Sequence, residues 1–401
     1  MKKSNERLKD EKMIKLTFLG DAMCKEHMLK AHQHKKGFDF NDVFERVKPL
    51  LEKSDYVFCN LETPISLNNT NLTNETYCFN SPLEYAMAIK EAGINFVSTA
   101  NNHCLDRGIE GIKSTIEALD KIGLKHTGIS AYSRQKPPIV DIQGLKIGVM
   151  SYTYGTNAFA NHCYLNKKQM FHVNLFQNQE LSSKITRFFY HNKRNFFTRV
   201  YWRILRMFNV YEGPLCEKRD FSLKRLYECY KDIRFLKRQQ VDKIIMLMHI
   251  GGQYNFEPVC YTKQITKWLY KKGVNIISGN HEHVVNGGIY DKIDNDFIAT
   301  YSLGNFVSSS GVFHEPFDKL CQYNIAWHIY LGEKGNIKKT TFTLLKNVAE
   351  GDKLRVVPCV ELLKSQKNKE ILLKEMKKIA DIFSKKDNDL TVVENNIEIE
   401  I

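Results

Sequence analysis

One local pattern recurs along the chain: a short apolar run that ends abruptly in polar, chemically capable residues. Apolar runs without alternation are typical of strands that are buried on both faces. Six segments follow the pattern, at 14–21 (IKLTFLGD), 55–62 (DYVFCNLE), 94–103 (INFVSTANNH), 243–252 (KIIMLMHIGG), 274–283 (VNIISGNHEH) and 297–305 (FIATYSLGN). The pattern predicts a buried sheet whose strands end in polar side chains.

Helical segments lie between several of these runs. Three are predicted, over 81–93, 108–123 and 261–273, and each ends at a glycine. In the first, Ser81 and Pro82 occupy positions typical of N-cap and N1, and Glu84 that of N3. Alternation of strands and helices predicts an α/β fold with parallel neighbouring strands. In such sheets, ligands bind beyond the carboxyl ends of the strands.

This rule places the polar side chains that end the runs around one site, at one edge of one inferred sheet. They are Asp21, Glu62, Asn102, His103, His249, His281 and His283. Taken singly, a histidine at a strand end is more often structural, and an aspartate after glycine is more often a turn or a helix cap. Together they supply the carboxylate, amide and imidazole ligands of a dinuclear hydrolytic site.

Residues 278–287 (SGNHEHVVNG) carry two histidines one residue apart. In an extended chain, the side chains of residues i and i+2 point to the same side. We therefore expect His281 and His283 to face one centre, with one ligand for each metal. Asn280 is expected only as a turn residue, and Glu282 is expected to point away.

The composition indicates the cellular compartment of the protein and the charge of its binding partners. The chain has 401 residues, ten cysteines without CxxC spacing and a net charge of +14. Unpaired thiols and the absence of a signal-like apolar segment favour a cytoplasmic protein, with peripheral contact at the inner membrane face left open. The positive charge favours anionic partners. No motif supports specific nucleic-acid binding.

The predicted organisation has three parts: a charged N-terminal tail over 1–12, a domain over 13–349, and a helical extension with a polar tail over 350–401. A basic, aromatic, helical insertion is predicted within the domain at about 160–238. One face of this helix would carry Phe197, Tyr201, Ile204 and Phe208, and another Arg199, Arg203 and Arg206. A surface helix is favoured; a lid over an anionic substrate and a membrane-surface helix stay open.

The motifs at the run ends resemble those of the CapA family of capsule and poly-γ-glutamate biosynthesis proteins. The matching stretches are FLGDAM (18–23), NLETPIS (60–66), STANNHCLDRG (98–108), MHIGGQYNFEPV (248–259), GNHEHV (279–284) and YSLGNFV (301–307). Their order and spacing agree from about residue 14 to 310, but the insertion and the tail have no counterpart. The family's domain is similar to calcineurin-like metallophosphatases, which implies a four-layer αββα sandwich.

The resemblance also implies roles for individual residues. Asp21 and His283 would bind the first metal, Glu62 would bridge, and Asn102, His249 and His281 would bind the second. A bridging water would be the nucleophile, His103 would protonate the leaving group, and Asp106 would orient His103. Asn305 would contact substrate or support the site, and Asn60 would contact substrate. The implied cofactors are one or two divalent ions of the Mn, Fe or Zn type, and the implied partner is an anionic polymer or phosphorylated substrate.

Two departures from the family pattern stand out. Metallophosphatases usually carry DxH at the first motif, but the residue two beyond Asp21 is Met23, so the first metal site lacks an imidazole. The fourth motif has Ile250 for a tryptophan and Gln253 for an acidic residue. The first departure favours the alternative of a non-catalytic scaffold that binds an anionic polymer or membrane through the insertion. Lys25 and His27 follow the first motif and could touch substrate, but a surface role is favoured for both.

Overall fold

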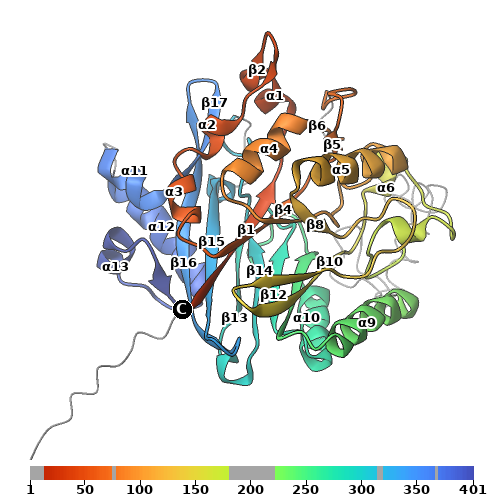
Figure 1. Ribbon diagram of the computed structural model, residues 1–401. Coiled ribbons are helices and arrows are strands. Elements are labelled where there is room, and N and C mark those ends of the chain that lie inside the picture. The colour runs from red at the N-terminus through yellow and green to blue at the C-terminus, as the bar shows by residue number, and fades with distance from the viewer. Residues whose placement is uncertain (1–12, 75–77, 180–221, 314–318, 366–368) are drawn as a thin grey trace, which may run out of the picture.

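Two β-sheets form the centre of the protein (Figure 1). The computed structural model describes residues 13–74, 78–179, 222–313, 319–365 and 369–401. The first sheet has the order β17 (Lys353–Pro358), β16 (Ile337–Glu350), β15 (Tyr323–Leu331), β1 (Ile14–Ala22), β4 (Tyr56–Leu61), β7 (Phe96–Ser98) and β8 (Lys125–Thr127), and β18 (Ile399–Glu400) also pairs with β16. Strands β1, β4, β7 and β8 are parallel, whereas β15 to β18 pair antiparallel.

The second sheet contains the later motif-bearing strands. Its order is β13 (Val285–Ile289), β14 (Ile298–Leu303), β12 (Ile276–Asn280), β11 (Lys243–His249), β10 (Leu145–Thr153) and β9 (Ile139–Ile142). Strands β14, β12, β11 and β10 are parallel, with an antiparallel strand at each edge. All six predicted runs are strands, but they divide between two sheets. The expectation of one sheet was wrong, because apolar runs do not record which strands pair.

The layers follow from the alternation of buried side chains along each strand. In β1, Leu16 and Phe18 belong to the core between the sheets, whereas Leu19 packs with the helices outside the first sheet. In β11, Ile245 faces the central core and Met246 packs with the helices outside the second sheet. Both faces of each sheet are therefore covered, which gives the four-layer αββα sandwich that the resemblance implied.

Helices cover both outer faces (Figure 1). Those packed on the first sheet are α1 (Glu26–His32), α2 (Asn41–Phe44), α3 (Lys48–Leu51), α4 (Leu83–Glu91) and α5 (Gly108–Ile122). The second sheet carries α9 (Leu223–Arg238) and α10 (Cys260–Lys272), and the short α6 (Ala158–Asn161) follows β10. None of the helices in the described part of the chain has both the length and the apolar composition that a membrane span needs.

The three predicted helices are present, but the cap assigned to the first was wrong. Ser81 and Pro82 form β6, which pairs with β5 (Ile65–Ser66), and Pro82 precedes the helix. The Ser81 hydroxyl lies 2.8 Å from that of Thr63, so it is engaged with a neighbouring loop instead of capping α4. Another two-stranded ribbon joins β2 (Gln33–His34) and β3 (Gly37–Phe38).

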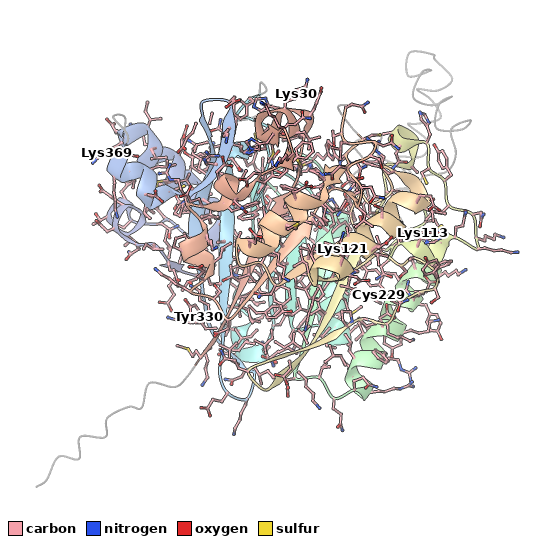
Figure 2. The ribbon with its side chains drawn as sticks, turned by 45° about the horizontal axis from the view of Figure 1, so that its top comes forward. Lys30, Lys113, Lys121, Cys229, Tyr330 and Lys369 are labelled. Carbon is pink, nitrogen blue, oxygen red and sulfur yellow. The ribbon has the colours of Figure 1, made fainter. Side chains whose placement is uncertain are left out.

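Most of the predicted basic insertion, residues 180–221, lies outside the described residues. Its end is α9, which Arg134 joins to β10: Nη2 of Arg134 donates to Asp232 of α9 at 2.7 Å and to the hydroxyl of Tyr152 at 2.5 Å. Lys113 and Lys121 lie on α5, whereas Lys30 lies on α1 and Lys369 at the start of a later helix (Figure 2).

The segment after residue 350 is integrated into the fold. Strand β17 continues the first sheet beside β16, and α11 (Cys359–Ser365) and α12 (Lys369–Ser384) add apolar side chains to the central core. Beyond α13 (Leu390–Asn395), β18 pairs with β16. The predicted helix near 370–384 is present, whereas the expected polar tail contributes the buried residues Val393 and Ile399.

Glu398 attaches this end to the first sheet. Its carboxylate accepts hydrogen bonds from Lys15 Nζ, the Tyr330 hydroxyl and, at 3.0 Å, the Thr341 hydroxyl. Burial raises the pKa of Glu398, but the bonds from Lys15 and Tyr330 outweigh it and lower the pKa to about 2. The ionised carboxylate therefore stabilises the fold above the unfolded pKa of about 4.3, and this contribution is lost as the pH falls towards 2.

Replacement of Glu398 by glutamine is expected to lower the unfolding free energy at pH 7 by roughly 1–2 kcal/mol, a value reduced for partial solvent exposure. The deficit should shrink at pH 3. Urea denaturation at both pH values measures it, with Glu400→Gln, an exposed residue two positions further along the chain, as the control. A deficit that is equal at the two pH values would argue against this role for the carboxylate.

Candidate metal centre

The strand ends of both sheets converge on one buried site. Asp21 lies in β1, and Glu62 directly follows β4. Asn102 and His103 come after β7, His249 ends β11, and the loop after β12 carries His281 and His283. None of these seven residues is more than 5% exposed. All seven residues predicted from the run ends therefore meet, and they come from two facing sheets.

Two groups of ligand atoms lie at this point. Asp21, Glu62 and His249 form one, Glu62, His281 and His283 form the other, and within each group the ligand atoms lie within 4.8 Å of one another. Glu62 belongs to both groups. A carboxylate shared by two sets of oxygen and imidazole ligands is the arrangement that a two-metal site requires.

Glu62 gives the clearest indication that the site suits cations. Its side chain is fully buried, and neither carboxylate oxygen has a hydrogen-bond donor among the described residues. Burial and, next, the Asp21 carboxylate raise the pKa of Glu62 to about 8. An unpaired buried carboxylate is costly, and a bound cation would remove that cost.

Asp21 is held in place from both sheets. Its Oδ1 accepts from Asn60 Nδ2 at 2.7 Å, and its Oδ2 accepts from the backbone N–H of His281 at 3.2 Å. Oδ2 also lies 3.5 Å from His283 Nδ1. Burial raises the pKa of Asp21, but His283 and His249 outweigh it and lower the pKa, so Asp21 is the ionised carboxylate of the site.

The imidazole nitrogens point at one another. His249 Nε2 lies 3.1 Å from His281 Nδ1, 2.6 Å from Asn102 Oδ1 and 3.5 Å from Glu62 Oε1. Burial lowers the pKa of His249 to about 4, which keeps this ring neutral, the form that binds metal. His249 Nε2 thus lies close to donor atoms of Asn102, His281 and Glu62, whereas the two ligand groups place His249 with Asp21 and His281 with His283.

The loop after β12 is not extended. His281 has φ 107° and His283 has φ 58°, both in the region that residues other than glycine rarely adopt. The alternation argument for these histidines was therefore wrong, although both rings do face the centre. Asn305 holds the loop, because its Oδ1 lies 2.9 Å from His283 Nδ1 and its Nδ2 donates to the His283 carbonyl at 3.2 Å.

Of the residues before and between the two histidines, Asn280 differs from expectation. Asn280 ends β12 and pairs with His249, so it is a strand residue and not a turn residue. Glu282 is fully buried and belongs to neither ligand group. It packs against Gly251, where a Cβ atom would come within 2.3 Å of Oε1. Its carboxylate thus lies against the loop that follows β11.

His103 is paired with a carboxylate on the side opposite to the ligands. Its Nδ1 lies 2.6 Å from Asp106 Oδ2, and its Nε2 lies 3.9 Å from Glu62 Oε1. Burial lowers the pKa of His103, but Asp106 and Glu62 outweigh it and raise the pKa above its ordinary value. Asp106 also accepts from the backbone N–H of Phe79 at 2.8 Å, and the Phe79 ring packs 4.3 Å from the His103 ring.

The two predicted substrate contacts have protein partners. Asn60 Nδ2 contacts Asp21 and lies 3.1 Å from His249 Nδ1, and its Oδ1 accepts from Ser98 at 2.8 Å. These bonds favour support of the ligands as the role of Asn60. Asn305 supports the loop of His283, one of the two roles considered for it.

Sequence reasoning missed the aromatic walls of the site. The Tyr154 ring lies 4.7 Å from that of His281, and Tyr254 lies 5.8 Å from His283. Tyr154 directly follows β10, so the rule of polar residues at strand ends could have identified it. Phe79 had no such signal, since it reaches His103 from a loop.

Comparison with known proteins places this site in a family. The model of the bacterial capsule synthesis protein family PGA_cap matches residues 15–310, a segment that contains every residue of the centre. The chain belongs to the PGA_cap family. The metallophosphatase-like character of this family agrees with the sandwich and with the ligand groups at its strand ends.

Two PGA_cap relatives show how far the similarity extends. The chain is 26% identical to the capsule biosynthesis protein CapA of Bacillus anthracis over 322 residues, which are 79% of this chain and 65% of that protein. It is 23% identical to the PGA biosynthesis protein CapA of Bacillus subtilis (strain 168) over 318 residues, which are 78% of this chain and 68% of that protein. The chain thus spans about two thirds of the length of each relative.

Proposed function

We propose that the chain is a metal-dependent hydrolase that serves the synthesis of a capsule, poly-γ-glutamate or a related surface polymer. Its proposed reaction is the attack of an activated water on a phosphoester or related bond. The observation that carries the proposal is the shared Glu62 between two groups of metal-type ligands. The names of the CapA relatives support the biosynthetic context.

The residues divide into ligands and an acid. Asp21, Glu62, Asn102, His249, His281 and His283 would hold one or two divalent ions of the Mn, Fe or Zn type. When bound, such ions lower the pKa of a water molecule so that it is a nucleophile at neutral pH. His103 donates a proton from Nε2 to the leaving group, since Asp106 engages Nδ1 and favours the protonated ring. Asn60 and Asn305 keep the ligands in position.

Metal analysis combined with hydrolysis of an aryl phosphate and an aryl phosphodiester tests this proposal. We expect the full chain, purified with Mn²⁺ or Zn²⁺, to retain one or two ions and to lose hydrolysis when a chelator removes them. A protein that binds neither ion and keeps the same thermal stability with and without them would overturn the proposal.

The second candidate is a non-catalytic protein that binds an anionic polymer or an anionic membrane surface. Met23 favours it, because this buried side chain stands where metallophosphatases usually supply an imidazole. Cosedimentation with anionic liposomes or with polymer, before and after neutralisation of Arg199, Arg203 and Arg206, tests it. Binding that disappears while the metal content is unchanged would support this candidate over the hydrolase.

A further inference from the structure

Lys25 is not the surface lysine that its sequence position suggested. Two loops that begin at the metal centre run side by side: the backbone N–H of Met23 donates to the Val307 carbonyl at 2.9 Å, and Ala22 forms a parallel bridge with Val307. Further along the same loops, Lys25 Nζ donates to the Ser310 hydroxyl. Lys25 is therefore half-buried on a pair of hydrogen-bonded loops that begins at Asp21 and Asn305.

The Lys25 ammonium has no matching carboxylate. It forms no ion pair with any of the described residues, and the carboxylate that attracts it is Glu62 of the metal centre. Burial lowers the pKa of Lys25, and the attraction of Glu62 offsets this only in part. A half-buried cation without a counter-ion is costly, and bound metal ions at Glu62 would increase that cost.

A second unsatisfied group lies in the same loop. The Ser309 side chain is fully buried, and within the described ranges its hydroxyl has no hydrogen-bond partner. The backbone N–H of Ser310 donates to the Ser308 hydroxyl at 3.2 Å, which fixes the turn. The Ser309 hydroxyl is therefore an unused hydrogen-bond donor, one residue before Ser310, whose hydroxyl binds Lys25.

We propose that Lys25, together with the hydroxyls of Ser309 and Ser310, forms a subsite beside the metal centre for an oxyanion group of the substrate, phosphoryl or carboxylate. The proposal rests on the proposed function, because it names the part of that site that recognises the charge of the substrate. An ammonium and two hydroxyl donors are the groups that bind such oxyanions in proteins.

Anion binding to the metal-loaded full chain tests the proposal without requiring turnover. Inorganic phosphate and acetate are titrated by calorimetry into the wild type and into Lys25→Gln, Lys25→Arg and Ser309→Ala. Loss of one charge-assisted bond should weaken binding of the preferred anion about tenfold or more in Lys25→Gln, and Lys25→Arg should retain most of it. The control is Lys30→Gln, since Lys30 is exposed and pairs with Glu26 on α1 (Figure 2).

Mass spectrometry of lysine acetylation gives the second readout. Phosphate or acetate should protect Lys25, but not Lys30, from acetic anhydride. Unchanged affinity in Lys25→Gln at equal metal content, or a wild type that binds neither anion and shows no protection, would overturn the proposal. If the wild type hydrolyses no ester and yet binds an anion through Lys25, the subsite stands and the proposed hydrolase fails.

Discussion

Replacement of His281 by alanine is expected to remove a metal ion and to lower hydrolysis roughly a thousandfold, well beyond the 10–100-fold typical of residues that only support ligands. His281 Nδ1 lies 3.1 Å from His249 Nε2 and belongs to the ligand group of Glu62 and His283, so its loss would remove a ligand from the proposed second metal position. Metal content and thermal stability with and without Mn²⁺ should both respond: the wild type gains stability when metal is added, and the variant gains much less.

A histidine outside the centre provides the matched control. His126 lies in β8 and contacts Asp120 at 3.2 Å, away from both ligand groups. The His126→Ala variant should keep the wild-type metal content and rate. If His281→Ala instead keeps the full metal content, His281 is not a ligand and the proposed second metal position is wrong.

Replacement of His103 by alanine is expected to lower kcat by about 10²–10⁴-fold while the metal content stays unchanged. The contrast with His281→Ala separates proton donation from metal binding. His103 belongs to neither ligand group, and its Nε2 faces Glu62 at 3.9 Å. Metal analysis and steady-state kinetics on the same preparations measure both effects. Loss of metal in His103→Ala would show that the ring holds an ion.

The pH profile provides a second check on His103. A general acid must be protonated, so the rate should fall as the pH rises through the pKa of His103, which Asp106 and Glu62 raise. Replacement of Asp106 by asparagine removes much of that effect, so the alkaline limb should move to lower pH and kcat should fall about 10–100-fold. An alkaline limb that does not move in this variant would contradict the assigned pair.

Much of the site could be predicted because strand ends are visible in the sequence. The apolar runs marked β1, β4, β7, β11, β12 and β14, and the candidate ligands are polar residues at or just after the ends of five of them. The sequence does not show which strands pair with one another, because a strand that is buried on both faces has the same composition in either sheet. Strand β17 was not predicted, because its short alternating run stands in a stretch that is rich in Lys and Glu.

The remaining errors concern interactions between distant segments. Ser81 has the right identity for a helix cap, but its hydroxyl is engaged with Thr63. The loop with positive φ angles at His281 and His283 is bound by Asp21 in β1 and by Asn305, which follows β14. The burial of Lys25 depends in the same way on Ser310. Such contacts are set by tertiary packing and leave no local signal.

The anomalous scattering of a crystal grown with Mn²⁺ tests the shared-carboxylate centre most directly. We expect a peak about 2.0–2.3 Å from a Glu62 oxygen, with His249, His281 and Asn102 as further ligands. A second peak between Glu62, Asp21 and His283 would show that the first position is filled despite Met23. Peaks only at surface carboxylates, with none beside Glu62, would contradict the central claim.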